Sequence, residues 1–114
     1  MVGLRREPPH AFLFHDWIDA TAVNTLRHHL RNITIAPRRL DLDCHSVRAI
    51  DPVGAALLWL LCKDLERRVG TYTRLVHLAL RVAQKLRNHP LSEYVVYGDE
   101  LFQDPFASPT PSNR

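Results

Sequence analysis

The stretch that most constrains this chain is residues 51–62, which open with Asp51 and Pro52 and continue as an apolar run. The Asp51 side chain can accept hydrogen bonds from the free N–H groups of a first helical turn. Pro52 suits the first helical position, because its φ is fixed and no N–H is needed there. Gly70 is placed to end the helix. We therefore predict a helix over residues 52–69 whose early part is apolar almost all round, as in a buried helix.

A strand precedes this helix. Leucines alternate with aspartates over residues 38–44, which is the period of two expected of a strand. Further strands are predicted at residues 11–14, 71–76 and 94–96, and further helices at about residues 20–31 (with Asp19 or Thr21 as N-cap) and 78–88. The resulting order, β-α-β-α-β-α-β, favours an α/β fold in which a small, mixed or mostly parallel sheet is packed by about three helices.

The length of 114 residues fits one domain that can bury a core without disulfides. We expect a flexible lead-in over residues 1–9, the domain over residues 10–97 and a disordered Pro/Ser-rich tail over residues 98–114. The longest apolar run is too short to span a bilayer, and the first residues lack the apolar core of a signal peptide. These features predict a cytoplasmic protein.

The net charge of +3 and the pI near 9.2 permit an acidic partner or an anionic membrane surface. The basic residues are scattered in isolated pairs, and no aromatic residues interleave with them as in a nucleic-acid platform. We therefore expect no nucleic-acid partner, and contact with a membrane only through another protein.

The cysteines, histidines and glycines do not form a pattern that indicates catalysis. Cys44 and Cys62 lie in apolar contexts and are expected to be buried small hydrophobes, and Cys44 has no visible activating neighbour. His28 and His29 are adjacent, so they cannot chelate a metal as an i, i+4 pair on a helix would. The four glycines are far apart and form no phosphate loop. No catalytic residue, metal or cofactor is predicted, and the protein is expected not to be an enzyme.

Several segments, in this order, resemble the STAS domain, a family of anti-sigma-factor antagonists and cytoplasmic domains of sulfate transporters. LDLDCHSVRAID at residues 40–51 is similar to the family's strand and loop that end in an aspartate, and Gly54 occupies a position where the family has a small residue. RRVG at residues 67–70 is similar to the next turn, LRVAQKL at residues 80–86 to the third helix, and WID at residues 17–19 to the end of the early strand. The resemblance covers residues 11–96.

Three positions depart from the family pattern. In switchable members, a Ser or Thr that a partner kinase phosphorylates follows the aspartate, whereas this chain has Pro52. No phosphorylation is expected there, and Ser46 is either a substitute site or a loop hydroxyl that satisfies a nearby backbone group. Asp16 stands where the family usually has glycine. No amphipathic helix is predicted after Val96. In this respect the chain resembles the small STAS subunits of bacterial phospholipid-transport ABC systems.

The resemblance implies a non-enzymatic interaction subunit that binds the ATPase subunit of a bacterial ABC-type phospholipid transport complex at the inner membrane. An alternative is an antagonist of an anti-sigma-factor kinase that has lost its phosphosite, and a third is a small ligand-binding or nucleic-acid-binding module. Asp51 is either part of a recognition site or only a helix cap, and both can hold, because the cap positions the loop that faces the partner. Trp59 could lie in the core or at an interface. The partner-binding residues that the resemblance implies are Asp51, Pro52, Val53, Ala55, Ala56 and Trp59.

Overall fold

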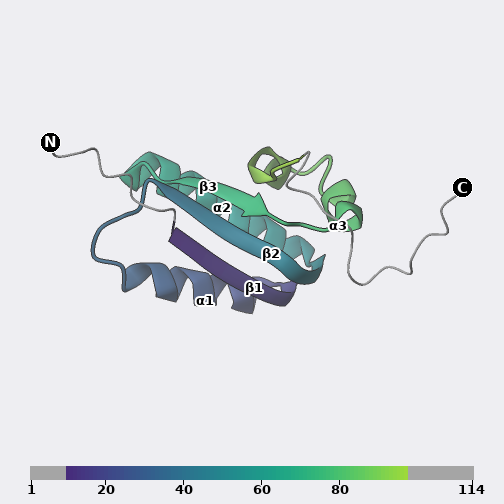
Figure 1. The fold of residues 1–114 in the computed structure, drawn as a ribbon, viewed down its shortest axis with the longest axis horizontal. Helices are drawn as coiled ribbons and strands as arrows, with labels where there is room; N and C mark the ends of the chain where they lie inside the picture. The colour runs from purple at the N-terminus through teal and green to yellow at the C-terminus, as the bar shows by residue number, and fades with distance from the viewer. Residues whose placement is uncertain (1–9, 98–114) are drawn as a thin grey trace, which may run out of the picture.

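Strands and helices alternate along residues 10–97, the part of the chain that the computed structural model describes (Figure 1). The elements are β1 (His10–Ile18), α1 (Ala20–Arg31), β2 (Arg39–Ile50), α2 (Pro52–Val69), β3 (Tyr72–Val76), α3 (Leu80–Lys85) and the 3₁₀-helix η1 (Pro90–Tyr94). This architecture confirms the predicted α/β class, with a small parallel sheet and three α-helices. The predicted lead-in over residues 1–9 and the predicted tail over residues 98–114 lie outside the described residues.

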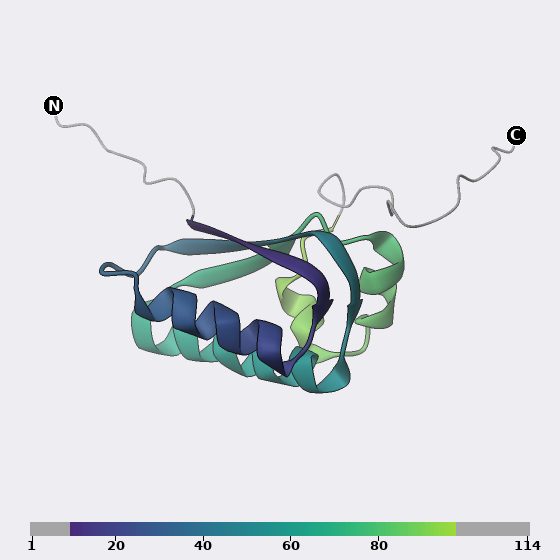
Figure 2. The same cartoon turned by 90° about the horizontal axis from the view of Figure 1, so that it is seen from below.

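The three strands form one parallel sheet in the order β1-β2-β3, with Leu42 of β2 opposite Phe12 and Leu75. A crossover between parallel strands is right-handed, so two crossovers in the same direction place α1 and α2 on the same face of the sheet. Figure 2 shows this arrangement, with both helices in one layer beneath the strands. The alternation in β2 fits it, because Leu40 and Leu42 are fully buried whereas Asp41 and Asp43 are partly exposed.

Helix α2 begins and ends at the predicted residues. Asp51 is its N-cap and Pro52 its first residue, and Gly70 follows its last turn with a φ of 72° in the left-handed region. Glycine adopts this φ without the steric cost that a Cβ atom brings. The last turn closes because the backbone N–H of Gly70 donates to the carbonyl of Glu66 at 3.2 Å. Both ends of the helix are therefore fixed by local sequence signals.

Strands β1 and β2 continue beyond the predicted residues 11–14 and 38–44. Their pairing shifts register between Leu13 and His15 and again between Asp16 and Trp17, which breaks the simple alternation by which a strand is detected in a sequence. Asp16, at the family's glycine position, has a φ of 52°. Aspartate tolerates this left-handed conformation better than most residues, so the bulge forms without glycine.

The C-terminal elements differ from the prediction. The third helix has six residues in place of the predicted 78–88, and Pro90 opens η1 instead of only ending a helix. The ring of His89 accepts the N–H of Leu91 at 2.9 Å and caps this 3₁₀-helix. The predicted strand at 94–96 is reduced to a parallel bridge between Leu75 and Val95, because residues 90–94 are already in η1.

The core lies between the sheet and the helix layer. Ile18, Leu26, Leu40, Leu42 and Leu58 are fully buried there. Cys44 and Cys62 are free and buried in the same core, which confirms the prediction for both. Among residues 10–97, no helix has the length and apolar character that crossing a membrane requires.

Candidate functional site

The first turn of α2 is built around the Asp51 carboxylate. One of its oxygens accepts the backbone N–H groups of Val53 and Gly54, each at 3.1 Å, while the Asp51 carbonyl accepts the N–H of Ala55 at 2.8 Å. Pro52 has no N–H to offer. The amide donors at this helix start are therefore already used within the chain, although such donors often bind anions at other helix starts.

Gly54 brings the start of α2 against the end of β1. A Cβ atom added at Gly54 would lie 2.2 Å from the backbone oxygen of Ile18 and 2.7 Å from Cα of Asp19. The same carbonyl of Ile18 accepts the N–H of Asp51 at 3.0 Å. Two backbones thus meet with no side chain between them, and this contact sets where the first turn of α2 lies.

The neighbouring helix start has the same type of cap. The Asp19 carboxylate accepts the N–H of Ala22 at 2.9 Å, which confirms Asp19 rather than Thr21 as the N-cap of α1. Because Asp19 also adjoins Gly54, the two capped starts lie side by side below the end of β1. The region is a rigid junction of three elements.

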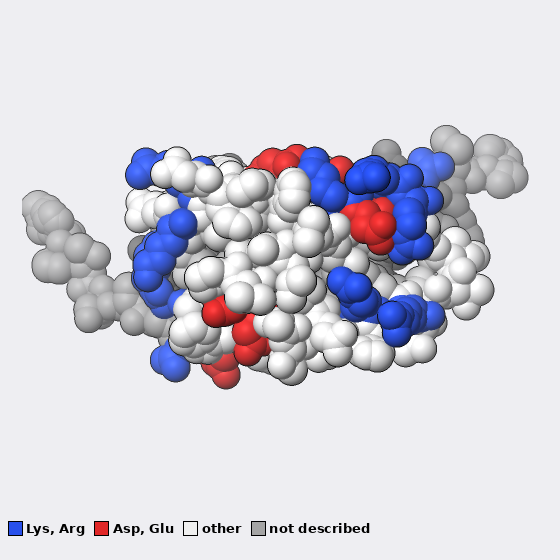
Figure 3. Space-filling model, turned by 180° about the vertical axis from the view of Figure 1, so that it is seen from behind, with Lys and Arg blue, Asp and Glu red and all other residues white. Residues whose placement is uncertain are grey.

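An exposed apolar surface follows this junction along α2. Val53 is 58% exposed and Leu60 is 53% exposed, and Ala56 between them is also exposed. Spacings of three and four residues place these side chains on one helix face, which we call the α2 stripe (Val53, Ala56 and Leu60). Figure 3 shows this helix side of the molecule, with a broad uncharged area across its middle. The prediction that the early part of α2 is buried all round is therefore wrong on this face, since the helix forms the outer layer of the fold.

The remaining predicted site residues lie in different surroundings. Ala55 is only 2% exposed and packs in the core, so its side chain does not reach the surface. Trp59 is half-buried against the core, and its indole N–H donates to Glu93 of η1 at 3.4 Å. Lys63 donates to the other Glu93 oxygen at 3.1 Å. Trp59 therefore combines the two predicted locations, since it packs against the core and also makes an exposed polar contact.

Two exposed residues that the sequence analysis did not select belong to this region of the chain. Leu60 completes the α2 stripe, and its position seven residues after Val53 is the signal by which it could have been found. Trp17, directly before Ile18, is 55% exposed. Large exposed apolar side chains of this kind are common in protein interfaces.

The thiols and histidines do not form a catalytic site. Burial raises the pKa of the Cys62 thiol to about 12 and raises that of Cys44 as well, so neither is a ready nucleophile at neutral pH. His29 contacts His10 of β1, with 2.8 Å between their Nε2 atoms, rather than joining His28. Within residues 10–97, no group of three His, Cys, Asp or Glu side chains could hold a metal ion.

One charged cluster lies on the sheet face opposite the two helices. The Asp43 carboxylate lies 3.0 Å from Nδ1 of His45 and 3.3 Å from Nδ1 of His77, and it accepts the backbone N–H of His45. Partial burial raises the pKa of Asp43, but these hydrogen bonds outweigh it and leave the pKa below its ordinary value of 3.8. The cluster ties the middle of β2 to His77, the residue that directly follows β3. Ser46, predicted in a loop, is a half-buried residue of β2 opposite His15.

Comparisons with known proteins agree with this architecture. The family model of the STAS domain matches residues 9–105. A solved structure described as a sulfate transporter family protein from Wolinella succinogenes superimposes with a TM-score of 0.65 at 22% sequence identity, covering 75% of this chain and 74% of that one. At that identity the likeness shows the shared fold. A search of curated proteins finds no match to this sequence.

STAS domains generally mediate protein–protein interaction or regulation rather than catalysis. The family match spans the two capped helix starts and the α2 stripe, and it reaches beyond the described C-terminal residues. It also agrees with the resemblance that the strand before Asp51 and the small residue at Gly54 indicate. This chain belongs to the STAS domain family.

Proposed function

We propose that this protein is a non-enzymatic subunit that binds the ATPase subunit of a bacterial ABC-type phospholipid transport complex through the start of α2. The observation that carries the proposal is the α2 stripe, an exposed apolar face directly after a firmly capped helix start. Exposed apolar side chains that share one face are typical of protein-binding surfaces. The contact residues on the proposed surface are Asp51, Pro52, Val53, Ala56 and Leu60, with Trp59 at its border.

The rigidity of this surface supports the proposal. The Asp51 cap, the Gly54 contact and the Gly70 turn fix α2 at both ends. A surface that is already ordered loses little conformational entropy when a partner binds, which favours affinity. Small side chains such as Ala56 also allow the backbone of a partner to approach the helix closely.

Pro52 supports the view that phosphorylation at this position does not regulate binding. It replaces the hydroxyl that switchable family members carry, and the Asp51 carboxylate occupies the amide donors that would otherwise receive a phosphate. The substitute site considered above, Ser46, lies half-buried in a paired strand rather than in an exposed loop, which makes it less accessible to a kinase. The proposed subunit therefore binds its partner constitutively.

A second candidate uses the same surface. An antagonist that binds an anti-sigma-factor kinase would also present the start of α2, and the lack of a hydroxyl at Pro52 would leave it permanently in its binding form. In either case the protein acts in the cytoplasm, and in the first it reaches the inner membrane through its partner. The two candidates differ in the class of ATPase bound.

Co-purification from the source cells distinguishes the two candidates. Recovery of an ABC ATPase with its membrane permease supports the first. Recovery of a kinase that also binds a sigma factor supports the second and overturns the first. The identified partner is then produced alone, and its affinity for this chain is measured by calorimetry.

Val53→Glu tests the position of the interface. A carboxylate placed in a close apolar contact costs several kcal/mol, so affinity should fall by about a hundredfold or more. The variant should fold normally, since Val53 is exposed. Val69→Glu, the same change at an exposed position at the far end of α2, is the matched control and should leave affinity unchanged. Equal affinity of the Val53→Glu and unaltered proteins would refute the interface.

A further inference from the structure

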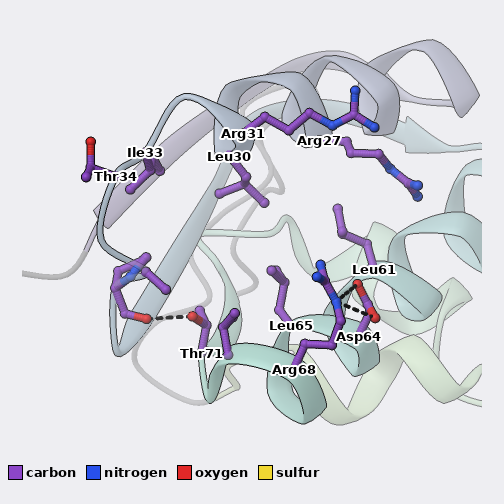
Figure 4. Close-up of a pocket in the computed structure, with 13 residues that line it drawn as sticks. Arg27, Leu30, Arg31, Ile33, Thr34, Leu61, Asp64, Leu65, Arg68 and Thr71 are labelled. Carbon is purple, nitrogen blue, oxygen red and sulfur yellow. Dashed lines mark hydrogen bonds and ion pairs between the residues drawn. The ribbon is translucent and has the colours of Figure 1, made fainter.

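A cavity of about 360 Å³ lies between the C-terminal halves of α1 and α2, where the loop that follows α1 covers one end. Its walls are mostly apolar, with polar and charged side chains among them. Leu30 of α1 and Leu65 of α2 point toward each other across it, with Leu61 beside them (Figure 4). At the loop end, the Thr71 hydroxyl donates to the carbonyl of Pro37 at 2.6 Å and holds the loop in place. The space is therefore a formed hollow rather than a gap between mobile segments.

Arginines from both helices surround this apolar hollow. Arg27 and Arg31 lie one turn apart on α1, and Arg68 projects from α2. The Nε of Arg68 lies 2.9 Å from both oxygens of Asp64, so that pair is neutral. Among residues 10–97, no acidic side chain pairs with Arg27 or Arg31. The hollow therefore carries an excess positive charge at its α1 side.

Helix electrostatics accounts for part of this arrangement. Basic residues in a last turn interact favourably with the negative end of the helix dipole, and Arg31 and Arg68 occupy such positions. The dipole does not account for the hollow itself or for Arg27, which lies a turn earlier. Apolar walls together with a few convergent charged groups are the usual composition of a small-molecule site.

We propose that this cavity binds a small anionic amphiphile, a molecule with one carboxylate or phosphate head and a short apolar body. The head would pair with Arg27 and Arg31, and the apolar body would lie against Leu30, Leu61 and Leu65. The volume of about 360 Å³ lies near the lower end of the range of roughly 300–1,000 Å³ that small-molecule pockets span. An eight-carbon chain with a charged head is therefore a suitable probe of the site.

This site is centred away from the helix start that carries the proposed docking surface, although Leu60 of the α2 stripe directly precedes Leu61 of the cavity wall. Val53 and Leu65 are twelve residues apart on α2, which corresponds to roughly 18 Å along the helix axis at a rise of about 1.5 Å per residue. The ligand proposal therefore does not depend on the identity of the protein partner. If the ligand proposal fails, the proposed protein interface is not refuted, and the reverse also holds.

Binding is tested with the full chain and three probes of equal chain length: octanoate, octyl phosphate and uncharged octanol. Two-dimensional NMR spectra are recorded at probe concentrations below those at which micelles form. We expect saturable binding of at least one anionic probe, with shifts confined to residues around the cavity. Tighter binding of octyl phosphate assigns the natural ligand to phosphate esters, and tighter binding of octanoate assigns it to carboxylic acids.

Arginine variants test the position of the head group. Arg27→Gln and Arg31→Gln should each weaken binding about ten- to a hundredfold, the effect of losing one hydrogen bond to a charged group. Arg67→Gln removes the same charge from an exposed neighbour that does not line the cavity, and it should have little effect. Ala36→Trp fills the cavity from its exposed loop side and should abolish binding of both anionic probes.

Three results would overturn the proposal. The first is that neither anionic probe binds at millimolar concentration. The second is that octanol binds as tightly as the anions, because the arginines would then contribute nothing. The third is that Arg67→Gln weakens binding as much as Arg31→Gln, which would indicate general attraction to a basic surface.

Discussion

Replacing Gly54 with alanine tests whether the close approach of two backbones sets the position of α2. The added Cβ would lie 2.2 Å from the oxygen of Ile18, well inside the separation of about 3.5 Å or more at which non-bonded atoms attract. Neither the oxygen of Ile18 nor the Cα of Asp19 can rotate away, because both are backbone atoms. The start of α2 must therefore move away from β1, which stretches the hydrogen bond from Asp51 to Ile18.

The expected loss of stability combines three contributions. Overpacking costs about 1–3 kcal/mol, and the weakened hydrogen bond costs about 0.5–1.5 kcal/mol. Alanine is better than glycine within a helix by about 1 kcal/mol, which acts in the opposite direction. The net effect of Gly54→Ala should be a decrease of about 2 kcal/mol in the free energy of unfolding.

Urea unfolding followed by circular dichroism measures this change, and two variants separate its causes. Gly70→Ala meets no atom within 4 Å but retains a φ of 72°, so its cost comes from backbone conformation alone and should be about 1 kcal/mol. Ala56→Gly, at an exposed position of the same helix, should cost about 1 kcal/mol from helix propensity. A Gly54→Ala protein as stable as the unaltered one would show that the junction can relax and that the contact does not fix α2.

Two further predictions concern groups whose pKa the fold shifts. Burial raises the pKa of Cys62 to about 12 and also raises the pKa of Cys44. Neither thiol should therefore react with Ellman's reagent at pH 8 until urea unfolds the chain. Rapid reaction of the folded protein would contradict their burial. The pKa of Asp43 is lower in the folded state than its ordinary 3.8, so its ionised form stabilises the fold above that pH, and this contribution is lost as the pH falls through the lowered value. The stability difference between the unaltered protein and Asp43→Asn should accordingly be largest above about pH 5 and shrink toward pH 2; a difference that stays constant with pH would contradict a role for the carboxylate charge.

Local signals explain which parts of the fold could be predicted. Helix α2 was predicted with its observed bounds because Asp51, Pro52 and Gly70 each act on the nearest turn of backbone. The 3₁₀-helix η1 was missed because Pro90 can either end one helix or begin another, and the choice depends on the pairing of Val95 with Leu75. That pairing joins segments twenty residues apart in the chain, so no local pattern contains it.

In the candidate site, too, local features could be predicted and features that depend on tertiary packing could not. The cap at Asp51 could be predicted, and the spacing of Val53 and Leu60 places both on one helix face. Their exposure depends on α2 lying in the outer layer, which the apolar sequence does not reveal. The cavity was beyond prediction because α1, α2 and the loop between α1 and β2 each contribute part of its wall. Ala55 was predicted to contact a partner because it adjoins the first turn of α2. Its position around the helix directs its side chain into the core instead.

The two proposed sites share α2, and the Gly54 contact determines whether they can influence each other. Coupling between sites requires an element with two arrangements that each ligand stabilises differently. A tilt of α2 away from α1 to widen the cavity would have to pivot near the junction, where the backbones of Gly54 and Ile18 already touch and the Asp51 hydrogen bond holds them. Because this contact and this hydrogen bond oppose movement of the helix start, we expect a ligand between α1 and α2 to leave the α2 stripe unchanged. The proposed docking surface would then be presented whether or not the cavity is occupied, and Pro52 offers no hydroxyl through which phosphorylation could change it.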